Sequence, residues 1–299
     1  MGMGRVGTAI VYEIAQKDLV SEIILINRNQ KKALAEALDI SHSLSQKDIT
    51  IKAGDYKDIS DSYITIITAG VGRLPNESRD DLLFKNASVL KEVVSNIIPY
   101  YRNSIVIVVS NPVDLMAHLV SELLKAEYGK VVGTGTLLDT ARLRYEISNK
   151  LSLPQNQIEC LVIGEHGANC IPLWNSIKII GDNEKKHSEN KKMDHKNILE
   201  NVHKAGDTII EGKGFTSCGI AFETGNLVKN LVDNSNKILP VSISLKGEYD
   251  TNANVFLSLP CIITEQGVKE TLVPEISDKE ISLFKKSTIK LQNHINQIF

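Results

Sequence analysis

The feature that most constrains the fold stands at the start of the chain, where three glycines are spaced Gly2-x-Gly4-x-x-Gly7. Residues 8–17 have the pattern of an amphipathic helix, and residues 22–26 (Glu-Ile-Ile-Leu-Ile) that of a buried strand. This glycine spacing suits a tight turn, the approach of a pyrophosphate to the backbone, and close helix–strand packing. The N-terminus of the helix would attract the phosphate charge. The first residues are therefore predicted to bind a dinucleotide.

A strand normally precedes this glycine turn in a doubly wound Rossmann parallel sheet, yet only Met1 stands before Gly2. In the usual strand order it lies in the middle of the sheet. Its absence would leave buried backbone groups of its neighbours unpaired, at about 1–3 kcal/mol each. We therefore expect the first strand to be missing from this sequence, and the working protein to carry about 6–8 more residues ahead of Met1.

The choice of cofactor depends on the end of the second predicted strand, which reads Asn27-Arg28. About 20 residues after the glycines, an NAD-binding unit usually has Asp or Glu to hold the ribose hydroxyls. Asn27 has no charge to repel a 2′-phosphate and Arg28 is able to pair with one, so NADP stays open beside NAD. The alternative is that Asn27 only hydrogen-bonds the ribose and Arg28 points to solvent.

Further buried strands are predicted over residues 63–67 and 104–109, with helices between them, which is the alternation of an α/β fold. Ala69 and Gly70 follow the first of these strands, and Asn111 follows the second. Because ligands bind at the carboxyl ends of the strands in such sheets, these residues are candidates for contact with the cofactor.

The polar loop over residues 71–81 contains two arginines, Arg73 and Arg79. One interpretation is a lid that brings arginine onto an anionic substrate. The other is a solvated loop that caps the helix beginning near Asp81.

An acid and a guanidinium share one helix face farther along, because Asp139 and Arg142 are three residues apart in Gly-Thr-Gly-Thr-Leu-Leu-Asp-Thr-Ala-Arg. Such a face can hold a histidine and a substrate carboxylate side by side. His166 supplies a histidine, on a turn between Gly164 and Gly167. For either piece alone, a surface ion pair or an ordinary turn histidine is the simpler reading; the two together favour a catalytic site.

Composition and charge exclude several classes of partner. The chain has 299 residues, a net charge of -2, 42% hydrophobic and 23% charged residues, and no apolar run long enough to cross a membrane. We therefore expect neither a nucleic-acid nor a membrane partner. The four cysteines, Cys160, Cys170, Cys218 and Cys261, have no metal-binding spacing, so no metal site is predicted. They indicate reduced thiols and a cytoplasmic protein.

The motifs together resemble those of the lactate/malate dehydrogenases, from Gly2 almost to the C-terminus. They are the glycine turn, Thr68-Ala-Gly70, Arg73 with Arg79, Ser110-Asn-Pro-Val-Asp114, the segment 133–142, and Gly164-Glu-His-Gly167. The resemblance implies a dinucleotide-binding domain over residues 1–133 and an α+β catalytic domain over residues 134–299. It also implies hydride transfer between a nicotinamide and a small L-2-hydroxy acid, in a homodimer or homotetramer.

The resemblance assigns a role to each catalytic residue. His166 would exchange a proton with the substrate oxygen, for which an ordinary pKa near about 6.5 is suitable. Asp139 would fix the histidine tautomer, Arg142 would bind the substrate carboxylate as a two-pronged fork, and Arg79 would polarise the carbonyl.

Three more residues acquire roles in the same way. Asn111 would contact both substrate and cofactor, Ile220 would pack on the nicotinamide, and Thr216 would line the substrate pocket.

The position of Arg73 bears on the substrate, because malate-specific members of the family resemble one another in having arginine there and lactate-specific members have glutamine. Oxaloacetate has a second carboxylate for Arg73, whereas pyruvate would leave a buried guanidinium unpaired, at about 2–5 kcal/mol. Thr216 and Trp174 look more like lactate dehydrogenases, and the segment 212–217 resembles hydroxyisocaproate dehydrogenases. We weight the charge most heavily and predict malate, with lactate or a bulkier 2-hydroxy acid as the alternative.

Two other classes of function compete with this reading. The NAD-dependent glycosidases have a related fold but need a metal-binding cysteine and histidine, whereas this chain has His166 with Asp139 and Arg142. The second alternative is a non-catalytic nucleotide-binding protein, which stays open because the first strand is expected to be missing.

Overall fold

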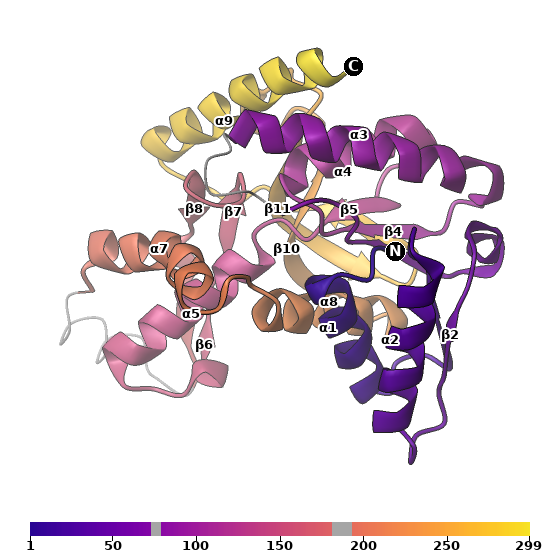
Figure 1. The fold of residues 1–299 in the computed structure, drawn as a ribbon. Helices are drawn as coiled ribbons and strands as arrows, with labels where there is room; N and C mark the ends of the chain where they lie inside the picture. Colours follow the sequence, from indigo (N-terminus) through magenta and orange to yellow (C-terminus); the bar gives the residue numbers. More distant parts are fainter. Residues whose placement is uncertain (73–78, 181–192) are drawn as a thin grey trace.

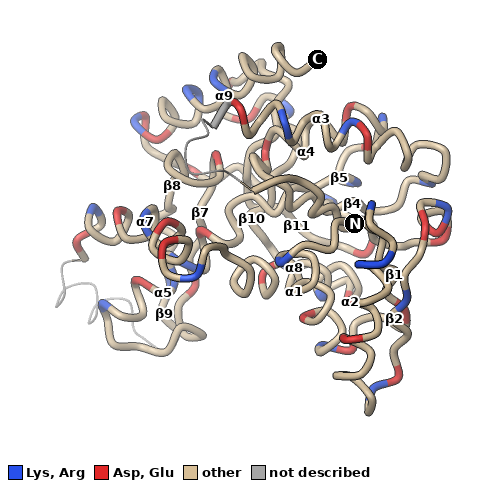
Figure 2. Tube along the Cα trace, in the orientation of Figure 1, with Lys and Arg blue, Asp and Glu red and all other residues tan. Residues whose placement is uncertain are grey.

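The computed structural model of this chain describes residues 1–72, 79–180 and 193–299, and only the backbone of Arg79 and Asp80. Helices surround a central sheet, with α1 and α8 on one side and α3, α4 and α9 on the other (Figure 1). Figure 2 shows both signs of charge interspersed along the outer helices α7 and α9.

The first half of the chain alternates strands with helices, as predicted. Its elements are α1 (Arg5–Gln16), β1 (Glu22–Leu25), α2 (Gln30–Ser43), β2 (Thr50–Ala53), η1 (Tyr56–Asp61), β3 (Ile64–Ile67), α3 (Arg79–Ile97), η2 (Ile98–Tyr100), β4 (Ile105–Val108), α4 (Val113–Leu124) and β5 (Val131–Gly133). β1 pairs with β2, and β3 with β4 and β4 with β5, all in parallel. The predicted doubly wound Rossmann arrangement is thereby confirmed.

The second half combines helices with antiparallel strands. Its elements are α5 (Leu137–Leu151), η3 (Gln155–Gln157), β6 (Ile158–Glu159), β7 (Val162–Gly164), β8 (Cys170–Pro172), η4 (Trp174–Ser176), β9 (Lys178–Ile179), α7 (His195–Lys213), α8 (Cys218–Val232), β10 (Lys237–Ser244), η5 (Glu248–Asp250), β11 (Phe256–Thr264), β12 (Gly267–Thr271) and α9 (Asp278–Ile298). The two long strands, β10 and β11, are antiparallel and pair along their length.

One sheet runs through both halves, in the order β3-β4-β5-β10-β11-β7-β8, with β12 beside β11. The join is antiparallel and brings Ser242 of β10 opposite Gly133 of β5. A side chain at Gly133 would meet Ser242 Cβ at 2.9 Å, so glycine suits this close approach. The continuous sheet fixes β7, which leads to His166, relative to β5, which leads to Asp139.

Helix α4 lies inside the protein between the sheet and α3 and α9 (Figure 1). All its residues from Val113 to Val120 are buried, which explains why it is apolar on nearly every face. Asp114 and His118 are the polar exceptions, at 3% and 2% exposure. A buried acid in an apolar helix requires a partner, and Asp114 finds its partners at the candidate site.

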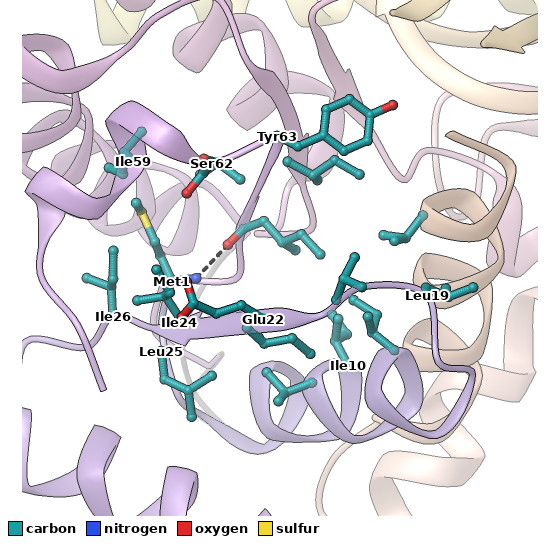
Figure 3. Close-up of a pocket in the computed structure, with 18 of the residues that line it drawn as sticks. Met1, Ile10, Leu19, Glu22, Ile24, Leu25, Ile26, Ile59, Ser62 and Tyr63 are labelled. Carbon is teal, nitrogen blue, oxygen red and sulfur yellow. Dashed lines mark hydrogen bonds between the residues drawn. The ribbon is translucent and has the colours of Figure 1, made fainter. Parts of the chain in front are cut away.

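The sheet is interrupted between β1 and β3, where the first strand was predicted to be missing. Met1 and Gly2 bridge the gap at one end: Gly2 N–H donates to Ile26 O at 2.9 Å, and Thr68 N–H to Met1 O at 2.9 Å. Beyond Met1 the two strands are separated by a cavity of about 900 Å³ (Figure 3).

Candidate active site

Helix α5 is fixed at its start by two threonines that bond to neighbouring strands. Thr136 donates its hydroxyl to Val162 O at 2.5 Å, and its N–H donates to Ser258 Oγ at 3.0 Å. One turn later, Thr140 Oγ1 accepts from Val162 N–H at 3.1 Å. Because both threonines contact Val162, Asp139 between them is held at a set distance from the turn that follows β7.

That turn carries His166, and its imidazole meets the carboxylate of Asp139. His166 Nδ1 and Asp139 Oδ2 are 2.6 Å apart. Asp139 is almost fully buried, at 1% exposure, whereas 26% of the His166 side chain is exposed. With Nδ1 bonded to Asp139, Nε2 is the ring nitrogen that remains for a ligand.

The two groups shift each other's pKa. Burial alone would lower the pKa of His166, but the charge and hydrogen bond of Asp139 outweigh it, so that pKa is raised. Burial opposes ionisation of Asp139, yet His166, Arg142 and the Gly167 N–H together lower the pKa of Asp139. The pair therefore favours a protonated imidazole beside an ionised carboxylate.

Arg142 lies on the other side of the same carboxylate, as its spacing on α5 predicted. Its Nη1 is 3.5 Å from Asp139 Oδ1, and 16% of its side chain is exposed. On α7, a Cβ at Gly206 would lie 3.3 Å from Arg142 Nη2, so glycine leaves room for the guanidinium. The fork is held loosely by Asp139 and has capacity to bind a second carboxylate.

Asp114 also belongs to the site, although in the sequence it is only the last residue of the motif Ser110-Asn-Pro-Val-Asp114 and carries no predicted role. Its Oδ2 accepts from the His166 backbone N–H at 3.0 Å, and its Oδ1 accepts from Ser242 Oγ at 2.5 Å. Burial raises the pKa of Asp114 from 3.8 to about 6, against the opposing effect of these two donors. Two buried aspartates thus hold His166, one by its ring and one by its main chain.

Glu165 fixes the same turn from the opposite side. Its carboxylate accepts from Asn169 Nδ2 at 2.7 Å and from Ser287 Oγ at 3.1 Å, and pairs with Lys290 Nζ at 2.6 Å. Ser287 and Lys290 belong to α9, so the C-terminal helix is tied to the turn that carries His166.

His203 of α7 is only partly exposed. Its Nε2 lies 3.6 Å from Cys170 Sγ, and burial lowers the pKa of this histidine although Asp139 opposes the shift. The helical pattern of α7 alone could not reveal this contact, because Cys170 lies on β8.

The three glycines of the first turn have different surroundings. Gly2 has φ +90°, and a Cβ there would lie 2.7 Å from Ala69 N; at Gly7 it would lie 2.2 Å from Gly2 O. Gly4, just before α1, has nothing within 4 Å of such an atom. Two glycines are therefore required by the fold, whereas Gly4 leaves open space at a helix N-terminus, where an anion binds well.

The residues predicted to hold the ribose follow β1, and those predicted at the next strand end follow β3. Asn27 Oδ1 accepts from the Met3 N–H at 3.0 Å, while Arg28 is exposed. Ala69, half-buried, accepts through its carbonyl from Ser110 Oγ at 2.6 Å, and Gly70 is exposed. Asn27 therefore stabilises the glycine turn through this hydrogen bond.

Asn111 is exposed beyond the end of β4, followed by a cis bond to Pro112. Its carbonyl accepts from Asn86 Nδ2 at 2.7 Å, and Asn86 Oδ1 accepts from Val71 N–H at 2.7 Å. Asn86, at 2% exposure, thus joins two loops at the carboxyl ends of the strands. Sequence reasoning missed it, since a single asparagine within a helical pattern carries no signal.

Thr216 and Ile220 lie near the start of α8, and both are half-buried. Ile220 packs against the apolar cluster beneath α1 and α8. Arg5, in the glycine turn, places its guanidinium 4.2 Å from the centre of the Phe215 ring. The glycine turn and the loop of Thr216 are therefore neighbours.

Not every predicted site residue is described. The structure brings together His166, Asp139 and Arg142, but Arg73 lies outside the described residues, as does the side chain of Arg79, the first residue of α3. Within the described ranges, no group of three His, Cys, Asp or Glu side chains is arranged to hold a metal ion. In those same ranges, no helix has the length and apolar character needed to cross a membrane.

Two family models match this chain. The first, described as lactate/malate dehydrogenase, NAD binding domain, covers residues 1–133; the second, lactate/malate dehydrogenase, alpha/beta C-terminal domain, covers residues 136–299.

Named relatives match over almost the whole length. L-lactate dehydrogenase 2 of Clostridium acetobutylicum is 36% identical, with 99% of this chain and 95% of the relative covered. L-lactate dehydrogenase of Lactococcus lactis subsp. cremoris is 36% identical over 100% of this chain and 96% of the relative. Among solved structures, the minor L-lactate dehydrogenase of Enterococcus mundtii, in a ligands-bound form, has a TM-score of 0.94 and 32% identity, covering 100% of this chain and 96% of that one. A lactate dehydrogenase from a Medee basin deep-sea metagenome library has a TM-score of 0.93 and 32% identity, covering 99% and 96%.

Proposed function

This chain belongs to the lactate/malate dehydrogenase family, and we propose that it is an L-lactate dehydrogenase that interconverts pyruvate and L-lactate. The observation that carries the proposal is the His166–Asp139 pair, 2.6 Å apart, with the guanidinium of Arg142 beside the same carboxylate. A proton donor next to a carboxylate-binding fork suits the reduction of a 2-oxo acid.

Each residue then has a defined task. In reduction, His166 gives a proton from Nε2 to the carbonyl oxygen of the substrate, and in oxidation it takes that proton back. Asp139 keeps the ring in the tautomer that leaves Nε2 free, and stabilises the charged imidazole. Arg142 binds the substrate carboxylate, which sets the carbonyl at the histidine. Asp114 holds the main chain of the same turn.

The remaining predicted residues complete the site. We assign Arg79 to the carbonyl oxygen, Asn111 to both substrate and cofactor, Ile220 to the nicotinamide, and Thr216 to the substrate pocket. The contact between Arg5 and Phe215 supports this arrangement, since it brings the glycine turn beside the loop of Thr216.

The cofactor of the family's first domain is NAD, and the residues present fit it. Gly4 offers open space at the start of α1, and Gly70 is exposed at the neighbouring strand end. When bound, the nicotinamide supplies or accepts the hydride. NADP use is supported only by the missing acid at Asn27 and the exposed Arg28, so we favour NAD.

The preference for malate drawn from Arg73 is not supported by the relatives, which are named L-lactate dehydrogenases. A preference for malate requires Arg73 to be buried against the substrate when the lid is closed. An arginine can instead place its charged end in water while its stem packs on the protein, and the unpaired-charge penalty then disappears. We therefore favour pyruvate over oxaloacetate.

We also propose that the two domains divide at residues 133 and 134 and that the enzyme acts as a homodimer or homotetramer. Large apolar side chains exposed on α2 and α8, Leu34, Leu38 and Phe222, support association, with 53%, 51% and 49% exposure.

Initial rates with pyruvate and with oxaloacetate, each with NADH and NADPH, test the proposal. We expect pyruvate with NADH to be the best pair, and Arg73→Gln to change its rate by less than about threefold, as for a solvent-exposed side chain. A preference for oxaloacetate that Arg73→Gln abolishes would restore the malate assignment. No activity with any pair, from a folded protein, would reject both.

A further inference from the structure

We propose that Lys290 of α9 is a positioning residue for His166 and acts through Glu165, an inference that rests on the proposed function. The first observation is the pair of groups that α9 directs at the Glu165 carboxylate. Lys290 Nζ lies 2.6 Å from Glu165 Oε1, and Ser287 Oγ donates to Glu165 Oε2 at 3.1 Å. Ser287 and Lys290 are three residues apart and share one face of the helix. The C-terminal helix therefore supplies an ammonium and a hydroxyl to the residue that directly precedes the proton donor.

The second observation is that α9 is anchored on both sides of Lys290. Before it, Phe284 is fully buried, and its ring lies 5.0 Å from the ring of Tyr249. After it, Lys91 of α3 donates to the carbonyl of Ile298. Because the helix is held at both ends, the Lys290 ammonium is a fixed point to which the turn is attached.

The third observation is that α9 and α4 hold the same turn. The two helices are in contact (Figure 1), with the ring of Phe299 5.9 Å from that of His118. His118 follows Asp114 on α4 by one helical turn. Asp114 accepts from the His166 N–H at 3.0 Å. The main chain of His166 is thus held by α4 directly and by α9 through Glu165.

The fourth observation concerns charge. Burial raises the pKa of Asp114, and the charge of Glu165 raises it further, so the two carboxylates act on each other. Only 13% of the Glu165 side chain is exposed, against 44% for Lys290. Loss of the ammonium would leave a largely buried carboxylate uncompensated beside a second one, which is unfavourable. Glu165 would then turn toward water and move His166 away from Asp114 and Asp139.

The test compares Lys290→Met and Lys290→Arg with Lys286→Met, a control that removes the same charge at an exposed position one turn earlier on α9. We expect Lys290→Met to lower kcat for pyruvate reduction at least about fivefold, as for a misplaced proton donor. The KM for pyruvate should change less than about twofold, because Arg142 of α5 still binds the carboxylate. Lys290→Arg keeps the charge and should stay within about twofold of the parent, as should Lys286→Met.

A double-mutant cycle tests whether Lys290 acts through Glu165. In a Glu165→Gln background the carboxylate charge is absent, so Lys290→Met should change kcat by less than about 1.5-fold. A full effect of Lys290→Met in that background would overturn the proposal. The proposal is also wrong if Lys286→Met causes the same loss, or if Lys290→Arg does not restore kcat. Should Glu165→Gln fail to fold, the kcat and KM of the two Lys290 variants decide.

Amide hydrogen exchange gives a readout that does not depend on catalysis. Lys290→Met should speed exchange at the His166 amide at least about tenfold. The Thr134 amide, which donates to Val108 O at 2.9 Å on the central sheet, should be unchanged. If the parent reduces no pyruvate but exchange changes in this way, the proposed function fails and the positioning by Lys290 stands. Unchanged exchange at His166, or equal acceleration at Thr134, would refute the positioning even in an active enzyme.

Discussion

Removing the charge of either aspartate that holds His166 should change the stability of the protein, and the two changes should have opposite signs. Asp114→Asn removes a carboxylate whose pKa burial raises, whereas Asp139→Asn removes one whose pKa is held low by His166 and Arg142. Asparagine is nearly the same size and can still accept a hydrogen bond, so each variant changes mainly the charge. We expect the first to gain stability and the second to lose it at neutral and alkaline pH.

The magnitude follows from the pKa of Asp114. A rise from 3.8 to about 6 means that the folded state ionises this group at a cost of roughly 3 kcal/mol relative to the unfolded chain. The cost is absent below the ordinary pKa and is complete above the folded one. From about pH 4.5 to about pH 8, the free energy of unfolding of Asp114→Asn should therefore rise by about 2 kcal/mol relative to that of the parent.

For Asp139 the sign is reversed. A carboxylate with a lowered pKa stabilises the fold above its ordinary pKa, and this contribution is lost as pH falls through the folded value. Asp139→Asn should therefore be harmful at neutral pH, where both Asp139 and His166 can be charged, and lose part of its effect in acid.

Urea unfolding of the parent and both variants at the two pH values measures these differences. Asp39→Asn, at an exposed position on α2, is the control for removing one negative charge. The reasoning fails if Asp114→Asn has the same effect at both pH values, or if its destabilisation grows as pH rises.

Three further predictions concern the active site. His166→Asn should keep NADH binding, measured by fluorescence titration, but lose at least about 100-fold in turnover, and a loss of only a few-fold would remove His166 from the mechanism. Asn27→Asp should shift the ratio of initial rates toward NADH over NADPH, since the carboxylate still accepts from the Met3 N–H and repels a 2′-phosphate; an unchanged ratio would mean that this side chain does not face the ribose. Gly4→Ala should leave Tm unchanged but weaken NADH binding at least about tenfold. Gly7→Ala should lower the free energy of unfolding in urea by about 1–3 kcal/mol, because its Cβ would lie 2.2 Å from Gly2 O. Equal effects of the two variants on stability would contradict this division.

Local patterns were enough to predict much of this molecule. The glycine turn, the buried strands and the helices between them predicted the Rossmann arrangement, because each depends on neighbours in sequence. The spacing of Asp139 and Arg142 predicted a shared helix face, and in the structure Arg142 and His166 lie on either side of the Asp139 carboxylate.

Contacts between distant segments were not predictable in this way. Nothing local indicates that β5 continues into β10, since that join depends on Ser242 and Gly133 approaching closely. Asn86 and Glu165 likewise take their roles from partners on other elements, Asn111 for the first and Ser287 for the second. In sequence, each is an ordinary polar residue.

Asp114 shows why the most informative site residue was the hardest to interpret. Just after Pro112, it has the position of an acid that stabilises a helix N-terminus, which is a common and solvent-exposed role. Only the burial of α4 on all sides and the arrival of the His166 turn give it a different one. The same burial that makes Asp114 costly to ionise brings it against the main chain of His166, so the loss of stability and the fixing of the histidine have a single cause. An Asn variant that gains stability while the pH dependence of pyruvate reduction moves to lower pH would show both consequences at once, because the charge of Asp114 also raises the pKa of His166.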